Sequence, residues 1–415
     1  MTVRVPPARH PLVSVLMVTY GGREWPLRAL ETLVERTEPI FEVVAIDNAS
    51  PDGTGKLVRE GVEGATVVLN DANRGLSAAL NQGAGLSSGR HLLLLNPDAL
   101  VGEGWLPPLL DRLEEEEEGT VAAVPRLLEP DGAIQEAGQI VDSAGQTLPV
   151  GAGSDAADPR YRFPRSVEYG TGACLLVRRA DFDAVGGMDE DFEPAYCEDV
   201  DLGFRLAARG RVVYEPRSTV VHHGGVSASE GARREMILRN RRVLLEKWGE
   251  RLAERPELIE LERYPHRPAV LRDLGLVDRL LVVTDELPDE PLAGILGTLA
   301  EPLEMLVTVA SREGGADRAL ALAGRGVEVV VAPPGGWFEE RLFHYSAVLT
   351  AGTDPELVAG AGRSQPQAVR LALPGLEGGA EAVVAFGPTH ENVPVLRLDL
   401  EAGVEDLLAL IGCAA

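Results

Sequence analysis

Short apolar runs alternate with stretches of helical spacing along the first part of the chain. The runs at 13–20, 41–46, 65–69 and 91–95 predict buried strands. Between them, residues 24–36 carry leucines at helical spacing, and a helix with small residues on one face is predicted after Gly75. Because strand and helix alternate with short connections, the pattern predicts a parallel, doubly wound sheet of the nucleotide-binding kind.

The last of these runs ends in the sequence Asn96-Pro97-Asp98. The four leucines before it predict a strand buried on both faces. Pro97 fixes its own φ and favours an extended Asn96, so the turn is stiff. Ligands bind at the carboxyl ends of strands in open α/β sheets. Asp98 is therefore a candidate ligand for a hard metal ion bound to a nucleotide diphosphate, and capping of the next segment is the alternative.

The middle of the chain continues with strands and helices and contains one irregular region. Residues 129–165, which are rich in Gly, Asp and Pro, predict a hairpin and a mobile loop. The other elements predicted there are a helix at 105–113, a strand at 121–124, a Gly-rich segment leading into a strand at 170–179, a helix at 182–185, an amphipathic helix from Asp199, strands at 212–214 and 219–221, and a long helix at 233–248.

The alternation of strands and helices restarts after a predicted linker at 265–268. We therefore predict a catalytic domain at 1–267, which includes the helices from about residue 231, and a smaller Rossmann-like α/β domain at 268–415. No catalytic constellation is found in the second domain, which favours an accessory or assembly role. Its predicted elements are strands at 280–284, 305–309, 327–331, 347–349, 382–386 and 395–398 and a helix at 404–411.

Composition narrows the possible partners and the compartment. The chain has 415 residues and a formal net charge of −26, which argues against nucleic acid as a partner. The acidic run at 114–118 is expected to be the solvated end of a helix. Three cysteines predict neither a disulfide framework nor a zinc site. Without a signal peptide or a membrane-spanning run, we expect a cytoplasmic protein, with peripheral contact at the inner face of the membrane left open.

Two polar clusters are candidates for chemistry. Glu198, Asp199 and Asp201 lie at the start of the predicted helix, where capping would explain one acid but not three. His222 and His223 end a strand and precede two glycines, so a ligand can approach them closely, although a structural role for a histidine is as common. The chain has no Gly-x-Gly-x-x-Gly after the first strand and no Walker loop, which weakens the dinucleotide and P-loop interpretations.

The order of these motifs resembles family 2 glycosyltransferases of the GT-A fold, most closely the bacterial rhamnosyltransferase-like and galactofuranosyltransferase-like branch. The resemblance covers roughly residues 11–250 and implies a mixed, mainly parallel sheet between helices. The motifs that carry it are Val-Ser-Val-Leu-Met-Val-Thr-Tyr at 13–20, Asp-Asn-Ala-Ser at 47–50, Asn-x-Gly at 73–75, Leu-Asn-Pro-Asp at 95–98, Gly-Thr-Gly-Ala-Cys at 170–174, Gly-Gly-Met-Asp-Glu at 186–190, Glu-Asp-Val-Asp-Leu at 198–202 and His-His-Gly-Gly-x-Ser at 222–227.

The resemblance implies a role for each matching residue. Asp199 would be the general base, and Glu198 its neighbour on the acceptor side. Asp98 would hold Mg²⁺ or Mn²⁺ together with His222, while His223 is the weaker candidate. The donor would contact Thr19, Tyr20, Gly21, Asp47, Asn73, Gly75, Asn96 and Asp98, and the acceptor would contact Gly172, Ala173 and Glu198. The chain departs from the family pattern at Gly21, where Asn is usual, and at Asn96, the first position of the Asp-x-Asp motif.

These roles imply a metal-dependent, inverting hexosyltransferase of bacterial cell-wall or polysaccharide biosynthesis. The donor would be dTDP-rhamnose or a UDP-sugar, and the acceptor a hydroxyl of a glycan or of a lipid-linked saccharide. A positioned carboxylate assists a weak hydroxyl nucleophile as a general base. A divalent ion stabilises the leaving diphosphate. The oligomeric state is open, and a dimer is compatible with the sequence.

Two alternatives remain from the residues. A sugar nucleotidyltransferase shares a similar α/β core, but its Gly-rich basic loop after the first strand would be represented here only by Gly21-Gly22-Arg23. A catalytically inactive sugar-nucleotide-binding or scaffold protein is the second alternative, suggested by the extra domain and by Asn96. The presence of Glu198, Asp199 and His222 argues against it.

Overall fold

The computed structural model divides the chain into two compact units. The first comprises residues 1–156 and 166–261, and the second comprises 157–165 and 262–415. The predicted linker at 265–268 and the predicted helix at 404–411 lie outside the described residues. The structure describes residues 2–114, 119–158, 161–224, 230–253, 255, 279–290, 292–300, 306–333, 335, 337–338, 347–350, 354–364, 369–372, 381–385 and 396–399.

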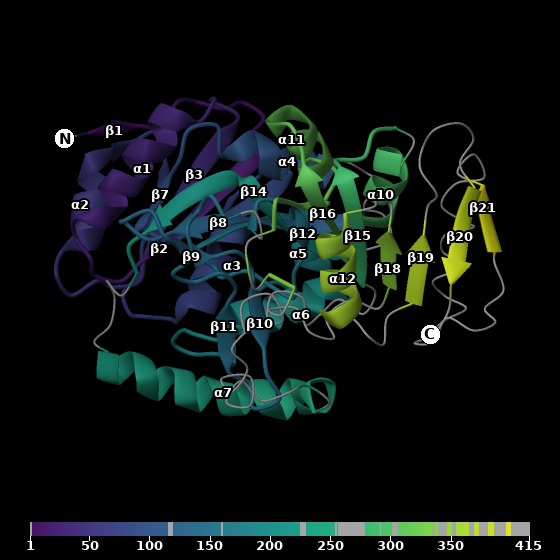
Figure 1. Ribbon diagram of the computed structural model, residues 1–415. Helices are drawn as coiled ribbons and strands as arrows, with labels where there is room; N and C mark the ends of the chain where they lie inside the picture. The colour runs from purple at the N-terminus through teal and green to yellow at the C-terminus, as the bar shows by residue number, and fades with distance from the viewer. Residues whose placement is uncertain are drawn as a thin grey trace. The chain divides into compact units, whose positions relative to one another are not determined.

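The first unit is an α/β structure built on one large sheet (Figure 1). Its strands are β1 (Val3–Arg4), β2 (Val13–Thr19), β3 (Phe41–Asp47), β4 (Val62–Glu63), β5 (Thr66–Leu69), β6 (His91–Leu95), β7 (Ala99–Val101), β8 (Thr120–Leu128), β9 (Ile134–Glu136), β10 (Gln139–Val141), β11 (Thr147–Pro149), β12 (Arg165–Ser166), β13 (Cys174–Arg178) and β14 (Arg211–His222). Its helices are α1 (Trp25–Arg36), α2 (Thr54–Gly61), α3 (Leu76–Leu86), α4 (Leu106–Glu114), α5 (Arg179–Ala184), α6 (Glu198–Ala207) and α7 (Glu230–Leu252).

The large sheet is mixed and mainly parallel, as predicted. Its strand order is β12-β14-β8-β13-β6-β2-β3-β5, with β7 paired to β14 and β9 to β8. Strands β6, β2, β3 and β5 run parallel to one another, and β14 runs parallel to β8. Strand β13 is antiparallel to both of its neighbours. The parallel part of the sheet therefore carries the predicted alternation of strand and helix.

Strand β6 lies at the centre of this sheet, and all five of its residues are buried. The prediction of a strand buried on both faces is confirmed. The turn that leads into β6 approaches β2 so closely that a Cβ on Gly89 would lie 2.6 Å from the Ser14 backbone nitrogen. Because β6 runs parallel to β2 and β3, the residues that follow these strands meet at one edge of the sheet. This edge collects Thr19, Asp47 and Asn96.

Several element predictions were too short or missed an element. The two strands predicted at 212–214 and 219–221 are one strand, β14, with a register shift between Glu215 and Thr219. Helix α2 was missed, because its first turn follows a cluster of turn residues at 47–53. Within the predicted hairpin region, β9 joins the large sheet while β10 and β11 form a separate antiparallel pair. Among the described helices, none is both long and apolar enough to cross a bilayer.

Helix α7 closes the first unit and lies alongside β10, β11 and α6 (Figure 1). Its buried residues Leu244 and Leu252 join a core cluster that contains Val200 and Phe204 of α6 and Val141 of β10. The long helix predicted at 233–248 is therefore present. Its apolar side covers the helix that begins with the candidate catalytic acids.

The second unit is also α/β, with a seven-stranded sheet in the order β17-β16-β15-β18-β19-β20-β21. The pairs from β17 to β19 are parallel, and the last two pairs are antiparallel. Strand β19 was not predicted. The elements are β15 (Arg279–Glu286), α10 (Leu292–Ala300), β16 (Leu306–Glu313), α11 (Ala316–Ala323), β17 (Glu328–Val331), β18 (Ala347–Thr350), α12 (Pro355–Ser364), β19 (Val369–Ala372), β20 (Glu381–Ala385) and β21 (Leu396–Asp399).

Candidate functional site

Asp47 ends β3 and is held at the edge of the sheet by two neighbouring segments. Its Oδ1 accepts a hydrogen bond from the Thr19 hydroxyl at 2.9 Å, and its Oδ2 accepts one from the Ser50 backbone N–H at 3.0 Å. Gly21 has φ +76° and donates its N–H to the Ser50 hydroxyl. Glycine and asparagine both tolerate this left-handed conformation. The departure from the family's Asn at position 21 therefore preserves the backbone shape, and Tyr20 beside it is exposed.

The loop at 73–75 is organised by Asn48, a buried residue that sequence reasoning did not assign to the site. Asn48 Nδ2 donates to Asn73 Oδ1 at 2.8 Å and to the Gly75 carbonyl at 3.0 Å. Asn73 Oδ1 also accepts the Gly75 N–H at 2.9 Å. The Asn73 side-chain oxygen is thus occupied within the loop. What the loop offers to a ligand is its exposed outer side, next to Arg74.

Asp98 and His222 are brought together by the pairing of β7 with β14. His222 Nε2 lies 3.3 Å from Asp98 Oδ1 and 3.3 Å from Asn96 Nδ2. On its other side, His222 Nδ1 lies 2.7 Å from Gln135 Oε1. The Gln135 amide nitrogen donates to the His222 carbonyl and to Glu129, each at 3.0 Å, which fixes the amide oxygen as the atom facing the ring.

This arrangement determines the tautomer of His222. An amide oxygen only accepts, so Nδ1 must carry a hydrogen. In the neutral ring, the lone pair of Nε2 then faces the Asp98 carboxylate. The Asn96 amide can donate to this lone pair at 3.3 Å, and a metal ion shared with Asp98 is the alternative partner. Cis ligands of an octahedral Mg²⁺ or Mn²⁺ lie about 3 Å apart, so the 3.3 Å separation fits one shared ion.

The second histidine has a different environment. The His223 ring packs on Trp25, with ring centroids 4.1 Å apart. The backbone N–H of His223 donates to the backbone carbonyl of Asp98. Within the described ranges, no group of three or more His, Cys, Asp or Glu side chains is arranged to hold a metal ion. An ion between Asp98 and His222 would therefore take its other ligands from phosphate oxygens and water, which is how Mg²⁺ is usually held.

The Gly-rich segment before β13 connects the Asn96-Pro97-Asp98 turn to the acidic pair, Glu198 and Asp199. Ala173 accepts a hydrogen bond from the Asn96 backbone N–H at 2.9 Å. The N–H of the preceding residue, Gly172, lies 3.3 Å from Asp199 Oδ2. Asp199 Oδ1 also accepts the Val200 N–H at 2.9 Å. The segment thus places Asn96 and Asp199 on either side of a single peptide stretch.

The two acids differ in their surroundings. Asp199 is partly exposed, whereas Glu198 is 5% exposed and its Oε2 has no hydrogen-bond partner in the described structure. Burial raises the pKa of Glu198, and the neighbouring Asp199 charge raises it further. Burial also raises the pKa of Asp199, but two backbone N–H groups oppose that shift. The negative charge of Asp199 therefore favours the protonated form of Glu198.

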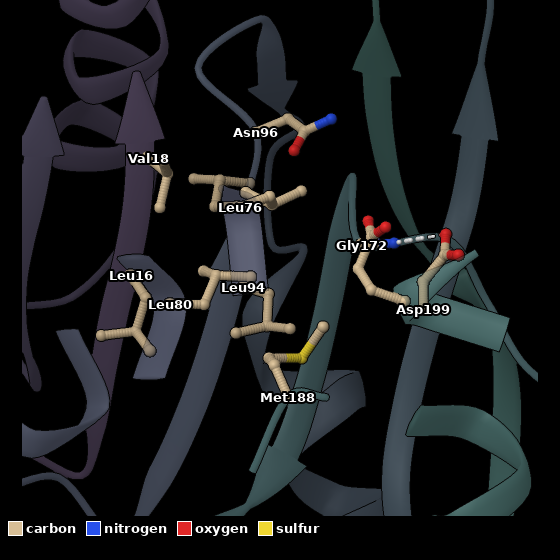
Figure 2. A pocket seen from close by; sticks show the side chains of 11 residues that line it. Leu16, Val18, Leu76, Leu80, Leu94, Asn96, Gly172, Met188 and Asp199 are labelled. Carbon is tan, nitrogen blue, oxygen red and sulfur yellow. Dashed lines mark hydrogen bonds between the residues drawn. The ribbon is translucent and has the colours of Figure 1, made fainter. Parts of the chain in front are cut away.

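A small cavity with a largely apolar lining lies beside Glu198 and Asp199. The cavity has a volume of about 10 Å³, close to the least space that one water molecule needs. Figure 2 shows its apolar wall of leucines, with Asn96, Gly172 and Asp199 at its polar end. A sugar is too large for this space. Beside the carboxyl groups, the cavity leaves room for about one water molecule.

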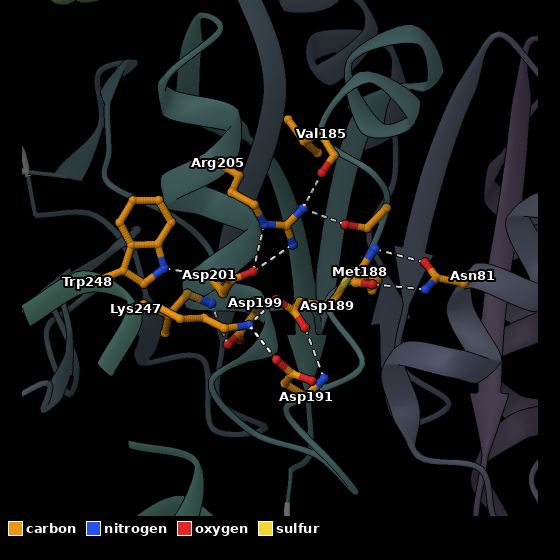
Figure 3. Close-up of polar contacts among 12 residues, drawn as sticks. Asn81, Val185, Met188, Asp189, Asp191, Asp199, Asp201, Arg205, Lys247 and Trp248 are labelled. Atoms are coloured by element: carbon orange, nitrogen blue, oxygen red, sulfur yellow. Dashed lines mark hydrogen bonds and ion pairs between the residues drawn. The ribbon is translucent and has the colours of Figure 1, made fainter. Parts of the chain in front are cut away.

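The third acid of the cluster has a structural role. Asp201 is 1% exposed and forms an ion pair with Arg205 at 2.7 Å. It also accepts a hydrogen bond from the Trp248 indole N–H at 2.9 Å (Figure 3). Capping of the helix explains one of the three acids at 198–201. The third is used to dock α7 onto α6.

Glu136 is a buried acid near the site that sequence reasoning missed. It is 4% exposed, and it accepts hydrogen bonds from the Thr171 N–H at 3.0 Å and from Gln139 at 2.8 Å. Burial raises its pKa to about 7, and the charge of Asp199 contributes to the rise. The sequence around position 136 contains no motif. Only the contact with the Gly-rich segment reveals its place next to the catalytic candidates.

We expect Glu136 to make the protein less stable as pH rises. The folded state keeps a proton that the unfolded state releases at the ordinary pKa of 4.5, so stability is lost between pH 4.5 and about 7. The fall in unfolding free energy from pH 5 to pH 8 should be smaller in Glu136→Gln, by up to about 3 kcal/mol. Urea unfolding at both pH values measures it. Equal pH dependence in the two proteins would contradict the expectation.

A family model and curated relatives match this chain and agree on one protein family. Residues 14–186 match the family described as Glycosyl transferase family 2. The chain is 34% identical over 247 residues to the O-antigen biosynthesis protein RfbC of Myxococcus xanthus. The aligned region covers 54% of this chain and 18% of that protein. It is 31% identical over 235 residues to the N-acetylglucosaminyl-diphospho-decaprenol L-rhamnosyltransferase of Mycobacterium tuberculosis. That aligned region covers 51% of this chain and 76% of that enzyme.

A solved structure is also similar in part. The crystal structure of GalNAc-T7 with UDP, GalNAc and Mn²⁺ has a TM-score of 0.45 at 19% identity, covering 57% of this chain and 48% of that one. The family match and the rhamnosyltransferase, most of whose length is covered, agree with the motif order at 13–227. The chain therefore belongs to family 2 of the glycosyltransferases, the enzymes that transfer a sugar from a nucleotide sugar.

Proposed function

We propose that this protein is an inverting, metal-dependent glycosyltransferase in which Asp199 removes the proton from the acceptor hydroxyl. The observation that carries the proposal is the environment of Asp199. Its carboxylate is partly exposed, is held by the Gly172 and Val200 N–H groups, and lies across one peptide stretch from Asn96. A base must be reachable by the acceptor and fixed in direction, and Asp199 meets both requirements.

Glu198 has a complementary role in this proposal. Its raised pKa keeps the carboxyl protonated near neutral pH, so the unpartnered Oε2 can donate a hydrogen bond. Two charged carboxylates side by side would repel each other. A neutral Glu198 leaves Asp199 as the single negative group facing the acceptor, with Gly172 and Ala173 forming the adjacent backbone.

Asp98 and His222 would hold the divalent ion, Mg²⁺ or Mn²⁺. Their facing acceptor atoms fit one shared ion, as the 3.3 Å separation and the tautomer of His222 indicate. When bound, such an ion stabilises the negative charge that develops on the leaving diphosphate. The chain's own contribution is to orient the donor. Asp47 and the Thr19–Gly21 turn lie on the base side, and the loop at 73–75 lies along the nucleotide.

The donor that we propose first is dTDP-rhamnose, and a UDP-sugar is second. The rhamnosyltransferase relative, of which the chain covers 76%, supports rhamnose. The names of both relatives support an acceptor in bacterial surface polysaccharide synthesis, either a glycan or a saccharide linked to a lipid diphosphate. The acceptor hydroxyl would reach Asp199 from the side of Glu198.

A thermal-shift screen of sugar nucleotides with and without Mn²⁺ tests the proposal. A ligand that binds only the folded state raises the melting temperature by mass action. We expect dTDP-rhamnose to give the largest shift, and only with Mn²⁺ present. Slow donor hydrolysis under the same conditions would identify an enzyme rather than a binding scaffold. Release of pyrophosphate from a nucleoside triphosphate would instead indicate a nucleotidyltransferase.

Gln135→Leu is expected to weaken Mn²⁺ binding by about 10- to 100-fold, the usual effect of losing the partner that orients a ligand histidine. Leucine cannot accept the His222 Nδ1–H, so the ring is free to rotate or change tautomer. Calorimetric titration with Mn²⁺ measures the change. Gln146→Leu, at an exposed position, is the matched control. Equal Mn²⁺ affinity in both variants would show that Gln135 does not orient the ligand.

A further inference from the structure

The segment that leads into the catalytic pair has an unusual backbone. Tyr196 has φ +79° and Cys197 has φ +70°, although neither is glycine. Side chains other than glycine disfavour this left-handed region, and two such residues in succession are rare. The helix that begins with Glu198 starts directly after them. The direction of Glu198 and Asp199 therefore depends on a conformation that the segment would not hold by itself.

The carbonyl groups of this segment are bound one after another. Pro194 accepts the N–H of Leu76, at the start of α3, at 2.7 Å. Ala195 and Tyr196 accept hydrogen bonds from a single donor, Asn240 Nδ2, at 2.9 Å and 3.0 Å. The carbonyl of Cys197 accepts the N–H of Asp201 within α6. Among these donors, only Asn240 donates from its side chain. Its amide bridges the Ala195 and Tyr196 carbonyls, which lie on either side of the left-handed Tyr196 Cα.

Asn240 is suited to this task. It lies in α7 and is completely buried. Rotating its amide would place the side-chain oxygen against two carbonyl oxygens, so the orientation with nitrogen facing the segment is fixed. Helix α7 is itself anchored to α6 by the Trp248–Asp201 hydrogen bond and to the preceding loop by the Lys247–Asp189 ion pair (Figure 3). The helix therefore forms a rigid support for the amide.

We infer that Asn240 is a positioning residue for the catalytic pair. Through Ala195 and Tyr196, it maintains the left-handed turn that directs Glu198 and Asp199 toward the acceptor. The Asn240 side chain touches neither substrate nor the reacting atoms, and its effect is transmitted by the backbone. The inference rests on the proposed role of Asp199 as the base.

Three variants separate a hydrogen-bonding role from simple packing. Asn240→Leu keeps the approximate size of the side chain but removes the donor to the two carbonyls. Asn240→Ala removes the side chain. Both should lower kcat about 10²-fold, the usual effect of displacing a catalytic group by about 1 Å, with donor affinity within about threefold of the original. Glu246→Ala, on an exposed part of the same helix, is the control and should be unchanged.

A rescue experiment tests the backbone mechanism directly. Glycine adopts the left-handed conformation without a steric penalty, so Cys197→Gly should relieve the need for the Asn240 clamp. The loss of kcat caused by Asn240→Ala should be at least threefold smaller in the Cys197→Gly background. Circular dichroism and donor binding confirm that each variant is folded.

The outcomes are distinguishable. Normal kcat in Asn240→Leu, or a loss of kcat in Asn240→Ala that Cys197→Gly does not reduce, would overturn the positioning role. If Asp199→Asn remains active, the proposed function itself fails, whatever the Asn240 variants show. If Asp199→Asn is inactive while both Asn240 variants are normal, only the inference about Asn240 fails.

Discussion

Asp199→Asn is expected to reduce glycosyl transfer by about 10²- to 10⁴-fold, the usual effect of removing a general base. Asparagine has nearly the same shape, and its one side-chain oxygen can still accept either the Gly172 or the Val200 N–H, so the fold around it should persist. An amide cannot take a proton from the acceptor hydroxyl. Initial rates with saturating donor and acceptor measure the loss, and nucleotide binding should be unchanged.

The matched control is Asp183→Asn, at an exposed position outside the site. It should keep its full rate. Turnover near that of the unmodified protein in Asp199→Asn would exclude Asp199 as the base. In the unmodified protein, the rate should fall with decreasing pH as Asp199 gains a proton. Because burial raises the pKa of Asp199, the fall should begin at a higher pH than for an ordinary aspartate.

Asp98→Ala is expected to weaken Mn²⁺-dependent donor binding by at least ~100-fold, since losing even an outer partner of a ligand reduces metal affinity by about 10- to 100-fold. In this variant, His222 Nε2 is the proposed metal ligand that remains. His222→Ala should act in the same direction. Calorimetric titration of the sugar nucleotide, with Mn²⁺ or with excess chelator, measures both variants.

His223→Ala distinguishes the two histidines. The His223 ring stacks on Trp25, so its loss should leave the Mn²⁺ dependence of donor binding in place. If His223→Ala removes that dependence and His222→Ala does not, the assignment of the metal ligand is reversed. Donor affinity that is the same in excess chelator as with Mn²⁺ would contradict the metal-dependent proposal altogether.

Much of the fold could be predicted from residue patterns. The run at 91–95 predicts β6 because an apolar run between turn residues that is too short for an ordinary helix favours a strand with both faces covered. Its stiff Asn-Pro-Asp turn predicts a polar group at the edge of the sheet. The 215–219 irregularity in β14 was interpreted as a break between two strands. A strand can bend through a register shift without ending, and local sequence does not reveal this.

The supporting residues of the site could not be predicted in the same way. Gln135 lies 87 residues from His222, and Asn240 lies 44 residues from Tyr196. Glu136 belongs to no motif, and Asn48 lies in the Asp-Asn-Ala-Ser motif without a role that the sequence assigns to it. Gln135 and Asn48 form hydrogen bonds with candidate residues, whereas Asn240 and Glu136 bind backbone groups next to the candidates. Such contacts leave no periodic pattern, so they become visible only when the chain is folded.

The amino-acid sequence by itself determined the α/β architecture and the positions at which polar groups follow buried strands. Hydrophobic periodicity sets the elements, and parallel pairing brings their carboxyl ends to one edge. The tertiary structure alone decided which groups can act there. Burial raises the pKa values of both Glu198 and Asp199, and the Asp199 charge raises that of Glu198 further, whereas backbone N–H groups oppose the rise at Asp199. The lone pair of His222 faces Asp98 because Gln135, from a distant strand, takes its other nitrogen.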